Sequence, residues 1–256
     1  MEFVDTHCHI ADPVYDPDRD EVIARSLAAG VGTMLLADVD SGEREAMFAL
    51  AKARPDCFRP MLGLYPGSVG ENWQEELDAL APWTEGHGIV AIGEIGLDYH
   101  YGTEFKSQQK DALKAQLEMA ARLDLPVNIH LREATEDFFM VLESCRGLGL
   151  RGNLHAFSGS RQTFERISRM GDWYVGIGGV LTFKKASIAE EIKYIPLERI
   201  VLETDAPYLS PTPYRGERND SSRIPVIAQF LAGIKGVSLG QVAATTTANA
   251  RKLFNL

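Results

Sequence analysis

The sequence contains only three cysteines, and their scarcity excludes a fold held together by disulfides. Cys8, Cys57 and Cys145 are widely spaced and odd in number. Small secreted domains that depend on disulfides usually carry a denser, even set. The few cysteines therefore indicate a reducing compartment, and we expect the protein to work in the cytoplasm.

Long apolar runs are also missing. No stretch approaches the roughly 20 apolar residues that a membrane-spanning helix needs. The opening Met-Glu-Phe-Val-Asp contains neither the basic segment nor the apolar segment of a signal peptide. We therefore expect no membrane association. The sequence also shows no low-complexity tail that would suggest a docking surface, and it identifies no protein partner.

Positive charge is in short supply, because 26 Lys and Arg face 36 Asp and Glu for a net charge of −10. Proteins that coat duplex nucleic acid are usually basic, since Lys and Arg replace the phosphate counterions. The acidic balance argues against strong non-specific binding of duplexes. It still permits a protein that grips one strand end, where metal ions and a few Arg neutralise one or two phosphates.

The sequence does show a regular alternation of short β-branched runs and amphipathic helical stretches. Eight segments are predicted to be strands: Phe3–His7, Gly32–Leu36, Phe58–Leu64, Ile89–Ile95, Val127–His130, Gly152–Phe157, Trp173–Gly178 and Ile200–Asp205. Strands separated by helices form a parallel sheet through right-handed crossovers. Eight such units in roughly 250 residues predict a (β/α)₈ TIM barrel, which we expect to form one domain over residues 1–256.

The helical stretches support the same architecture. They are Asp18–Ala29, Gly42–Ala53, Asn72–Thr84, Glu104–Leu123, Thr135–Cys145, Arg161–Met170, Ala186–Tyr194, Ile224–Ile234 and Leu239–Leu253. Two of them follow the last strand, so an extra C-terminal helix is expected. A doubly wound open sheet is the alternative, but its first strand would normally be followed by a Gly-rich phosphate loop. Here His-Cys-His-Ile-Ala-Asp occupies that place.

Ionisable residues gather at the predicted strand ends, where the chemistry of a TIM barrel lies. The set consists of His7, His9, Glu94, His130, His155 and Asp205. It includes four of the six histidines in the chain, and scattered surface histidines would not sort in this way. Side chains alternate along an extended chain, so His7 and His9 point to one face and Cys8 to the other.

A structural explanation exists for some of these residues taken singly. His130 or His155 alone would more often be a hydrogen-bonded core histidine than a ligand. Glu94 and Asp205 each end an apolar strand, where a buried carboxylate is costly unless it is paired or bound to a metal. The set as a whole therefore favours a metal centre.

The number of these side chains predicts two divalent ions, because one catalytic metal typically needs three protein ligands and a water. Glu94 is the expected bridge, since a carboxylate has two oxygens. A water shared by two ions is a hydroxide near neutral pH, and Asp205 would bind one ion or exchange that water's proton. Asp5 and Glu203 are expected to orient ligands. Nitrogen and oxygen ligands admit Mg, Mn, Zn or Ni.

A second group of polar residues follows the last predicted strand, between Pro211 and Asn219. It offers three candidate substrate contacts: Tyr214, Arg215 and Arg218. Arginine suits phosphate or carboxylate, and a tyrosine ring can stack on a base. Arg132 shares the parity of His130 and is expected at the same mouth. The alternative is an ordinary solvated loop, because acidic neighbours partly cancel the charge.

Together these residues resemble the TatD family of metal-dependent deoxyribonucleases, within the amidohydrolase-like superfamily. The resemblance covers nearly the whole chain and rests on Phe3–His9, Gly93–Tyr99, Pro126–Arg132, His155–Gly159, Glu203–Pro207, Pro213–Gly216 and Thr247–Phe254. It implies divalent metals on the six strand-end residues. It also implies hydrolysis of phosphodiester bonds, often as a 3′→5′ exonuclease that uses Mg²⁺ on DNA ends, which for this acidic chain are expected to be single-stranded.

The sequence departs from the family pattern at two places. Ala11, followed by Asp12, stands where the family usually has Asp or Asn, and Asp220-Ser221 stands where it commonly has Glu-Pro. We expect the first at the rim of the metal site and the second in the substrate loop.

Two other functions fit parts of the same pattern. An amidohydrolase acting on a small amide, ester or lactone would use the metals to polarise a carbonyl, and Asp205 would protonate the leaving group. Many such enzymes bridge their metals with a carbamylated Lys, whereas the fourth strand here has Glu94 and no Lys. A barrel that keeps its metals only for stability is the third possibility, but no ligand is missing.

Overall fold

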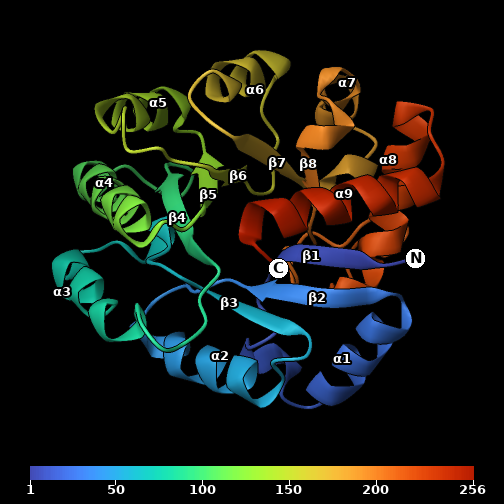
Figure 1. Cartoon of the computed structure of the whole chain (residues 1–256), viewed down its shortest axis with the longest axis horizontal. Coiled ribbons are helices and arrows are strands. Elements are labelled where there is room, and N and C mark those ends of the chain that lie inside the picture. Colours follow the sequence, from blue (N-terminus) through green and yellow to red (C-terminus); the bar gives the residue numbers. More distant parts are fainter.

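The computed structural model describes residues 1–256 and confirms the predicted (β/α)₈ barrel. Its strands are β1 (Phe3–Cys8), β2 (Val31–Leu36), β3 (Phe58–Leu62), β4 (Ala91–Asp98), β5 (Val127–Arg132), β6 (Gly152–Leu154), β7 (Trp173–Ile177) and β8 (Ile200–Leu202). They pair in parallel in the order β1 to β8 (Figure 1). A parallel bridge between Cys8 and Ala206 brings the end of β1 beside the chain that leaves β8, so the barrel nearly closes.

Helices surround the strands. They are α1 (Arg19–Ala28), α2 (Ser41–Ala53), α3 (Trp73–Asp78), α4 (Lys106–Leu123), α5 (Thr135–Ser144), α6 (Arg161–Ser168), α7 (Ile188–Glu191), α8 (Ile224–Lys235) and α9 (Leu239–Phe254). Side-chain oxygens of Asp40, Ser160 and Ser238 accept backbone N–H groups at the starts of α2, α6 and α9. Such caps satisfy donors that have no partner within the helix.

The extra helix α9 closes one end of the barrel (Figure 1). Its buried Ala250, Leu253 and Phe254 pack against strand residues that include Val4 of β1 and Val201 of β8. These strand residues lie at or near the start of their strands, so α9 covers the N-terminal end of the barrel. The C-terminal end, where the predicted site residues lie, stays free of this helix.

Several element ends differ from the sequence prediction. The fourth strand runs to Asp98 rather than ending at Ile95, because Gly96, Leu97 and Asp98 pair with β5. The sixth and eighth strands are shorter than predicted. The chain beyond them adopts positive φ angles, 43° at Ala156 and 57° at Asp205, that an extended strand cannot contain.

Two predicted helices are each divided into an α-helix and a 3₁₀ turn. The stretch Asn72–Thr84 forms α3 and then a 3₁₀ turn over Ala81–Trp83, which contains Pro82. Proline lacks the N–H that a continuous helix would need there. The stretch Ala186–Tyr194 forms α7 and a 3₁₀ turn over Ile192–Tyr194.

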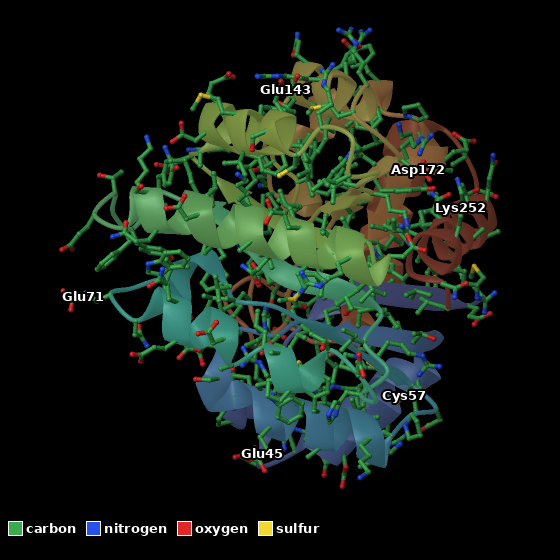
Figure 2. The ribbon with its side chains drawn as sticks, turned by 60° about the vertical axis from the view of Figure 1, so that its left-hand side comes forward. Glu45, Cys57, Glu71, Glu143, Asp172 and Lys252 are labelled. Atoms are coloured by element: carbon green, nitrogen blue, oxygen red, sulfur yellow. The ribbon has the colours of Figure 1, made fainter.

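Much of the acidic surplus lies on the outside of the helical layer. Glu45 on α2, Glu71 ahead of α3 and Glu143 on α5 are all exposed (Figure 2). No single helix is both long and apolar enough to cross a membrane. The segments Ser221–Lys235 and Leu239–Phe254 reach that length and composition only together, and they are bent by 109°.

Gly96 allows β4 and β5 to approach where they carry site residues. Its φ is +152°, and a Cβ at this position would lie 1.8 Å from the carbonyl oxygen of His130. We expect Gly96→Ala to push β5 away and to lower the free energy of unfolding by about 3 kcal/mol. Urea unfolding of the variant measures this loss.

Gly233→Ala is the matched control for this prediction. Gly233 lies exposed in α8, and a Cβ there would meet no atom within 4 Å. The control should be neutral or stabilising by roughly 0.5–1 kcal/mol, because alanine is the better helix former. Equal stability of Gly96→Ala and the wild type would contradict the close approach.

Candidate metal centre

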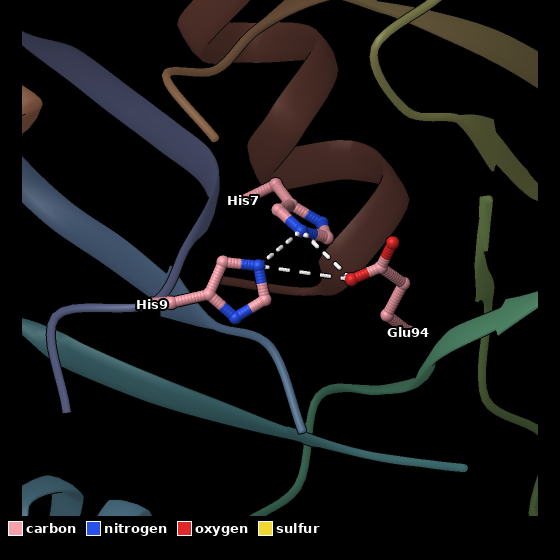
Figure 3. A group of neighbouring side chains, drawn as sticks. All are labelled: His7, His9 and Glu94. Carbon is pink, nitrogen blue, oxygen red and sulfur yellow. Dashed lines mark hydrogen bonds and ion pairs between the residues drawn. The ribbon is translucent and has the colours of Figure 1, made fainter. Parts of the chain in front are cut away.

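His7 of β1, His9 just after it and a glutamate from β4 meet at the C-terminal end of the barrel. The Nε2 atoms of His7 and His9 are 3.2 Å apart, and Glu94 Oε2 lies 3.3 Å from the first and 3.7 Å from the second (Figure 3). The chain around them is fixed, because the His9 N–H donates to the Ala206 carbonyl at 2.7 Å. The predicted alternation along the first strand thus leads both imidazoles to one point.

The second oxygen of Glu94 faces another pair of histidines. Glu94 Oε1 lies 2.7 Å from His130 Nδ1 and 2.8 Å from His155 Nε2. These two nitrogens are 3.0 Å apart. The carboxylate therefore stands between two groups, a His7–His9 side and a His130–His155 side, and turns one oxygen toward each.

Asp205 joins the His7–His9 side. Its Oδ1 lies 3.6 Å from His7 Nε2 and 3.5 Å from His9 Nε2. The positive φ of 57° at Asp205 ends the extended run of β8 at this point. The Asp205 N–H donates to the His7 carbonyl at 3.0 Å, which ties the residue to β1.

Hydrogen bonds on the outer sides of the imidazoles fix which nitrogen faces the centre. His7 Nδ1 lies 2.8 Å from Asn128 Oδ1, an oxygen that can only accept, while the Asn128 amide donates to Asn153 Oδ1 at 3.2 Å. His130 Nε2 lies 2.9 Å from Asp98 Oδ2. Each outer nitrogen therefore donates, and His7 Nε2 and His130 Nδ1 are the nitrogens that face the centre.

Sequence reasoning missed Asp98 and Asn128 as partners of the histidines. Asp98 shares the parity of Glu94, but the predicted fourth strand ended before it. Asn128 precedes His130 by two residues and shares its parity, so it could have been found by extending the same rule. The clue in both cases was a buried polar side chain on the inner face of a strand.

Asp5 and Glu203 lie beside the centre and accept hydrogen bonds from the chain around it. Asp5 accepts four hydrogen bonds, from the backbone N–H groups of His7 and Thr204 and from the hydroxyls of Thr204 and Ser221. Glu203 accepts the Ala156 N–H, and its Oε1 lies 3.7 Å from His155 Nδ1. Both carboxylates thus hold the chain around the histidines.

Asp220-Ser221, the second departure from the family pattern, takes part in these contacts around Asp5. Ser221 donates to Asp5, and the buried Asp220 accepts the Ser222 N–H at 2.9 Å and pairs with Arg25. The expectation that these residues lie in a substrate loop is therefore wrong, because their side chains bind to β1 and α1.

The histidines and carboxylates of the centre shift one another's pKa values. Burial lowers the pKa of His155, but the carboxylates of Glu94 and Glu203 outweigh it and raise the pKa to about 10. Burial likewise lowers the pKa of His130, while its hydrogen bonds with Asp98 and Glu94 raise it to about 9. Burial raises the pKa of Glu94, but the positive charge of His155 and His7 brings it well below its usual value.

The donor set fits divalent cations. Nitrogen and oxygen atoms within each of three groups lie within 4.8 Å of one another: His7, His9 and Glu94; His7, His155 and Asp205; Glu94, His130 and His155. Imidazole and carboxylate donors suit Zn, Mn and related ions. A buried carboxylate among imidazole nitrogens is an arrangement that such a cation stabilises when it replaces their protons.

The candidate substrate contacts differ in what surrounds them. The Arg132 guanidinium contacts only Tyr101, with the ring centroid at 5.2 Å, and Arg215 lies over the Phe183 ring at 3.6 Å. Neither forms an ion pair. The Tyr214 ring is covered by the Arg223 guanidinium at 3.5 Å.

The Arg218 side chain contacts the connection between β1 and α1. Its guanidinium donates to the Val14 carbonyl, pairs with Asp18 and lies over the Tyr15 ring at 4.6 Å. These contacts give the side chain a structural role and leave its place in substrate binding a prediction.

The chain is similar to known proteins over nearly its whole length. The profile of the family described as TatD related DNase matches residues 4–255. The uncharacterized metal-dependent hydrolase YabD of Bacillus subtilis is 33% identical over 253 residues, which cover 98% of each chain. The 3′-5′ ssDNA/RNA exonuclease TatD of Erwinia tasmaniensis is 35% identical over 258 residues, which cover 98% of this chain and 99% of that protein.

A solved structure agrees with the fold over nearly its whole length. The crystal structure of YJJV, a TatD homologue from Escherichia coli K12, has a TM-score of 0.92 and 30% sequence identity. The match covers 99% of this chain and 98% of that one.

Asp98→Asn should weaken metal binding by about 10- to 100-fold, because it removes the carboxylate that holds His130 Nε2–H. Competition with a chromogenic chelator measures the affinity. Asp137→Asn is the control, because Asp137 accepts from Tyr99 and pairs with Lys106 rather than with a histidine. Equal affinities of the two variants would contradict the role of Asp98.

Metal binding should release protons. His130 and His155 carry protons in the metal-free protein at neutral pH, because their pKa values are raised to about 9 and about 10. Protons compete with the metal for these nitrogens, so affinity should rise as the pH rises toward 9. Calorimetry in two buffers of different ionisation enthalpy measures the release, and identical heats in both buffers would contradict it.

Proposed function

This chain belongs to the family of TatD-related DNases and is a metal-dependent hydrolase, and from that premise we propose that it removes nucleotides from the 3′ end of single-stranded DNA. The observation that carries the proposal is the position of Glu94 between two groups of ligands at the open end of the barrel. The name of the Erwinia relative supports the polarity and the single-stranded substrate.

We infer two divalent cations per chain, with Mg, Mn or Zn as candidates. His7, His9 and Asp205 would hold one, His130 and His155 the other, and Glu94 would give one oxygen to each. Bound cations would polarise a phosphoryl oxygen and lower the pKa of water toward neutrality.

Asp205 is the proposed proton acceptor. Burial raises its pKa, but the hydrogen bond with His9 and the charge of His7 lower it below the usual value, so the carboxylate is ionised. In the proposed reaction, a water oxygen bonds to phosphorus and the bond from phosphorus to the 3′ oxygen of the preceding nucleotide breaks. Asp205 takes the proton that the water loses and returns it to this 3′ oxygen, so the products are a nucleoside 5′-monophosphate and a shortened strand with a 3′ hydroxyl.

Unpaired cations near the C-terminal end of the barrel support binding of phosphates. Arg132 follows His130 on β5, and Lys184, Lys185 and Arg215 lie in the connections after β7 and β8. None of the four forms an ion pair, and although Arg132 donates a 3.4 Å hydrogen bond to the Tyr101 hydroxyl, no carboxylate neutralises its charge. Since the outer helices are rich in exposed acids, we infer a short footprint confined to the mouth of the barrel.

A digestion time course tests the proposal directly. Single-stranded DNA is labelled at the 5′ or the 3′ end in separate tubes and incubated with EDTA-stripped protein, with and without added Mg²⁺, Mn²⁺ or Zn²⁺. We expect a metal-dependent ladder that starts at the 3′ end. Asp205→Asn should slow it by about 100-fold or more, because the proton acceptor is lost. Hydrolysis of small esters or lactones with no digestion of DNA ends would contradict the proposal.

Arg132→Ala should raise KM for oligonucleotides by roughly tenfold, because a charged hydrogen bond to phosphate is lost. It should also reduce the salt slope of binding to single strands by about 0.7. Arg122→Ala is the control, because this exposed arginine at the end of α4 carries the same charge away from the mouth. Equal effects of the two variants would show that only net charge matters.

A further inference from the structure

An exposed aromatic side chain lies directly beside the metal centre. Tyr208 follows Asp205 by three residues, and 55% of it is exposed. Its ring centroid is 6.2 Å from that of His9, with the ring planes at 66°. No cation lies over the Tyr208 ring, and its hydroxyl forms no hydrogen bond within the chain. A large apolar ring is thus presented to solvent at the site of the proposed reaction.

The backbone that carries this ring is held firmly. The Tyr208 N–H donates to the Asp205 carbonyl at 2.8 Å, and its carbonyl accepts the buried Asn219 amide at 2.6 Å. Its neighbour Leu209 has a φ of +55°, which is strained for a residue with a side chain. Strain of this kind persists where the surrounding structure enforces it, and it is frequent at ligand sites.

Other tyrosines in the neighbouring connections are engaged within the chain. Tyr65 is half-buried and meets His130 edge-on, with ring centroids 5.1 Å apart. The Arg132 guanidinium lies over one face of the exposed Tyr101 ring at 5.2 Å, and the Arg223 guanidinium lies over the Tyr214 ring at 3.5 Å. Tyr208 therefore offers a ring face that its own chain does not use.

Acidic side chains lie around the Tyr208 ring. Burial raises the pKa of Tyr208, and the negative charges of Asp12, Asp205 and Glu43 raise it further, so its ring lies on an acidic side. The unpaired Arg132 lies at the end of β5, which is opposite β1 in the strand order. A strand body with its phosphates suits the unpaired arginines. A 3′-terminal nucleotide has no phosphate beyond the bond to be cut, so its base suits the acidic surroundings of Tyr208.

We propose that Tyr208 stacks on the base of the 3′-terminal nucleotide and so selects substrates that end in a base. The inference rests on the proposed exonuclease function and specifies which part of the substrate this face of the mouth receives. Stacking on an aromatic ring tolerates any base, so the site would trim ends without reading their sequence.

Matched oligonucleotides test the proposal. One ends in a 3′ thymidine, and the other ends in an abasic tetrahydrofuran residue. Tyr208→Ala should lower kcat/KM on the first by roughly 5- to 150-fold, as expected for loss of one base stack. It should cause no comparable loss on the abasic substrate, and Tyr208→Phe should keep the base preference. Tyr194→Ala removes another exposed tyrosine ring, in the connection from α7 into β8, and is the control.

A binding readout distinguishes stacking from a structural role. The oligonucleotide carries 2-aminopurine as its 3′-terminal base behind a phosphorothioate linkage that slows cleavage. Wild-type protein should quench its fluorescence, and Tyr208→Ala should not. Persistent quenching by the variant, or equal loss of activity on both substrates, would overturn the proposal. Failure of the proposed function is distinct, because wild-type protein would then digest neither substrate.

Discussion

The centre depends on one buried carboxylate. Glu94 sits in the middle of the buried strand β4 with almost no exposure, and an isolated charge there would be very costly. Four imidazoles surround it, and at least two are fixed from outside by Asn128 and Asp98. This buried carboxylate therefore requires positive charge beside it. Protons supply that charge in the metal-free protein, and divalent cations replace them in the proposed active form.

The two ends of the barrel are built differently, and both support this centre. At the N-terminal end, α9 packs Leu253 and Phe254 against residues near the strand starts, such as Val4 and Val201. At the C-terminal end, Asp5 gathers β1, the chain after β8 and the start of the α8 region through four hydrogen bonds. Closure of the β1–β8 seam thus brings His7, His9 and Asp205 together, although they are far apart in sequence.

Much of the fold and the clustering of the strand-end side chains could be predicted from the sequence, because both depend on periodicity. Alternation along short strands identified the face of His7 and His9, and an acid ending an apolar run identified Glu94 and Asp205. Contacts between distant segments carry no such signal. The pairing of Arg218 with Asp18, and of Ser221 with Asp5, depends on how loops from opposite ends of the chain meet. Asp98 was not predicted as a partner of His130 because the end of β4 is set by its pairing with β5. The sequence of the β4 segment alone does not show where that pairing ends.

Electron paramagnetic resonance of the Mn²⁺-loaded protein tests the shared carboxylate most directly. If Glu94 gives one oxygen to each of two ions, each chain should bind two Mn²⁺, and their spectrum should show spin coupling across a bridge of about 3.5–4 Å. Glu94→Gln should lose that coupling, while Asp137→Asn should retain it. One Mn²⁺ per chain, or two with independent spectra in the wild type, would contradict the account.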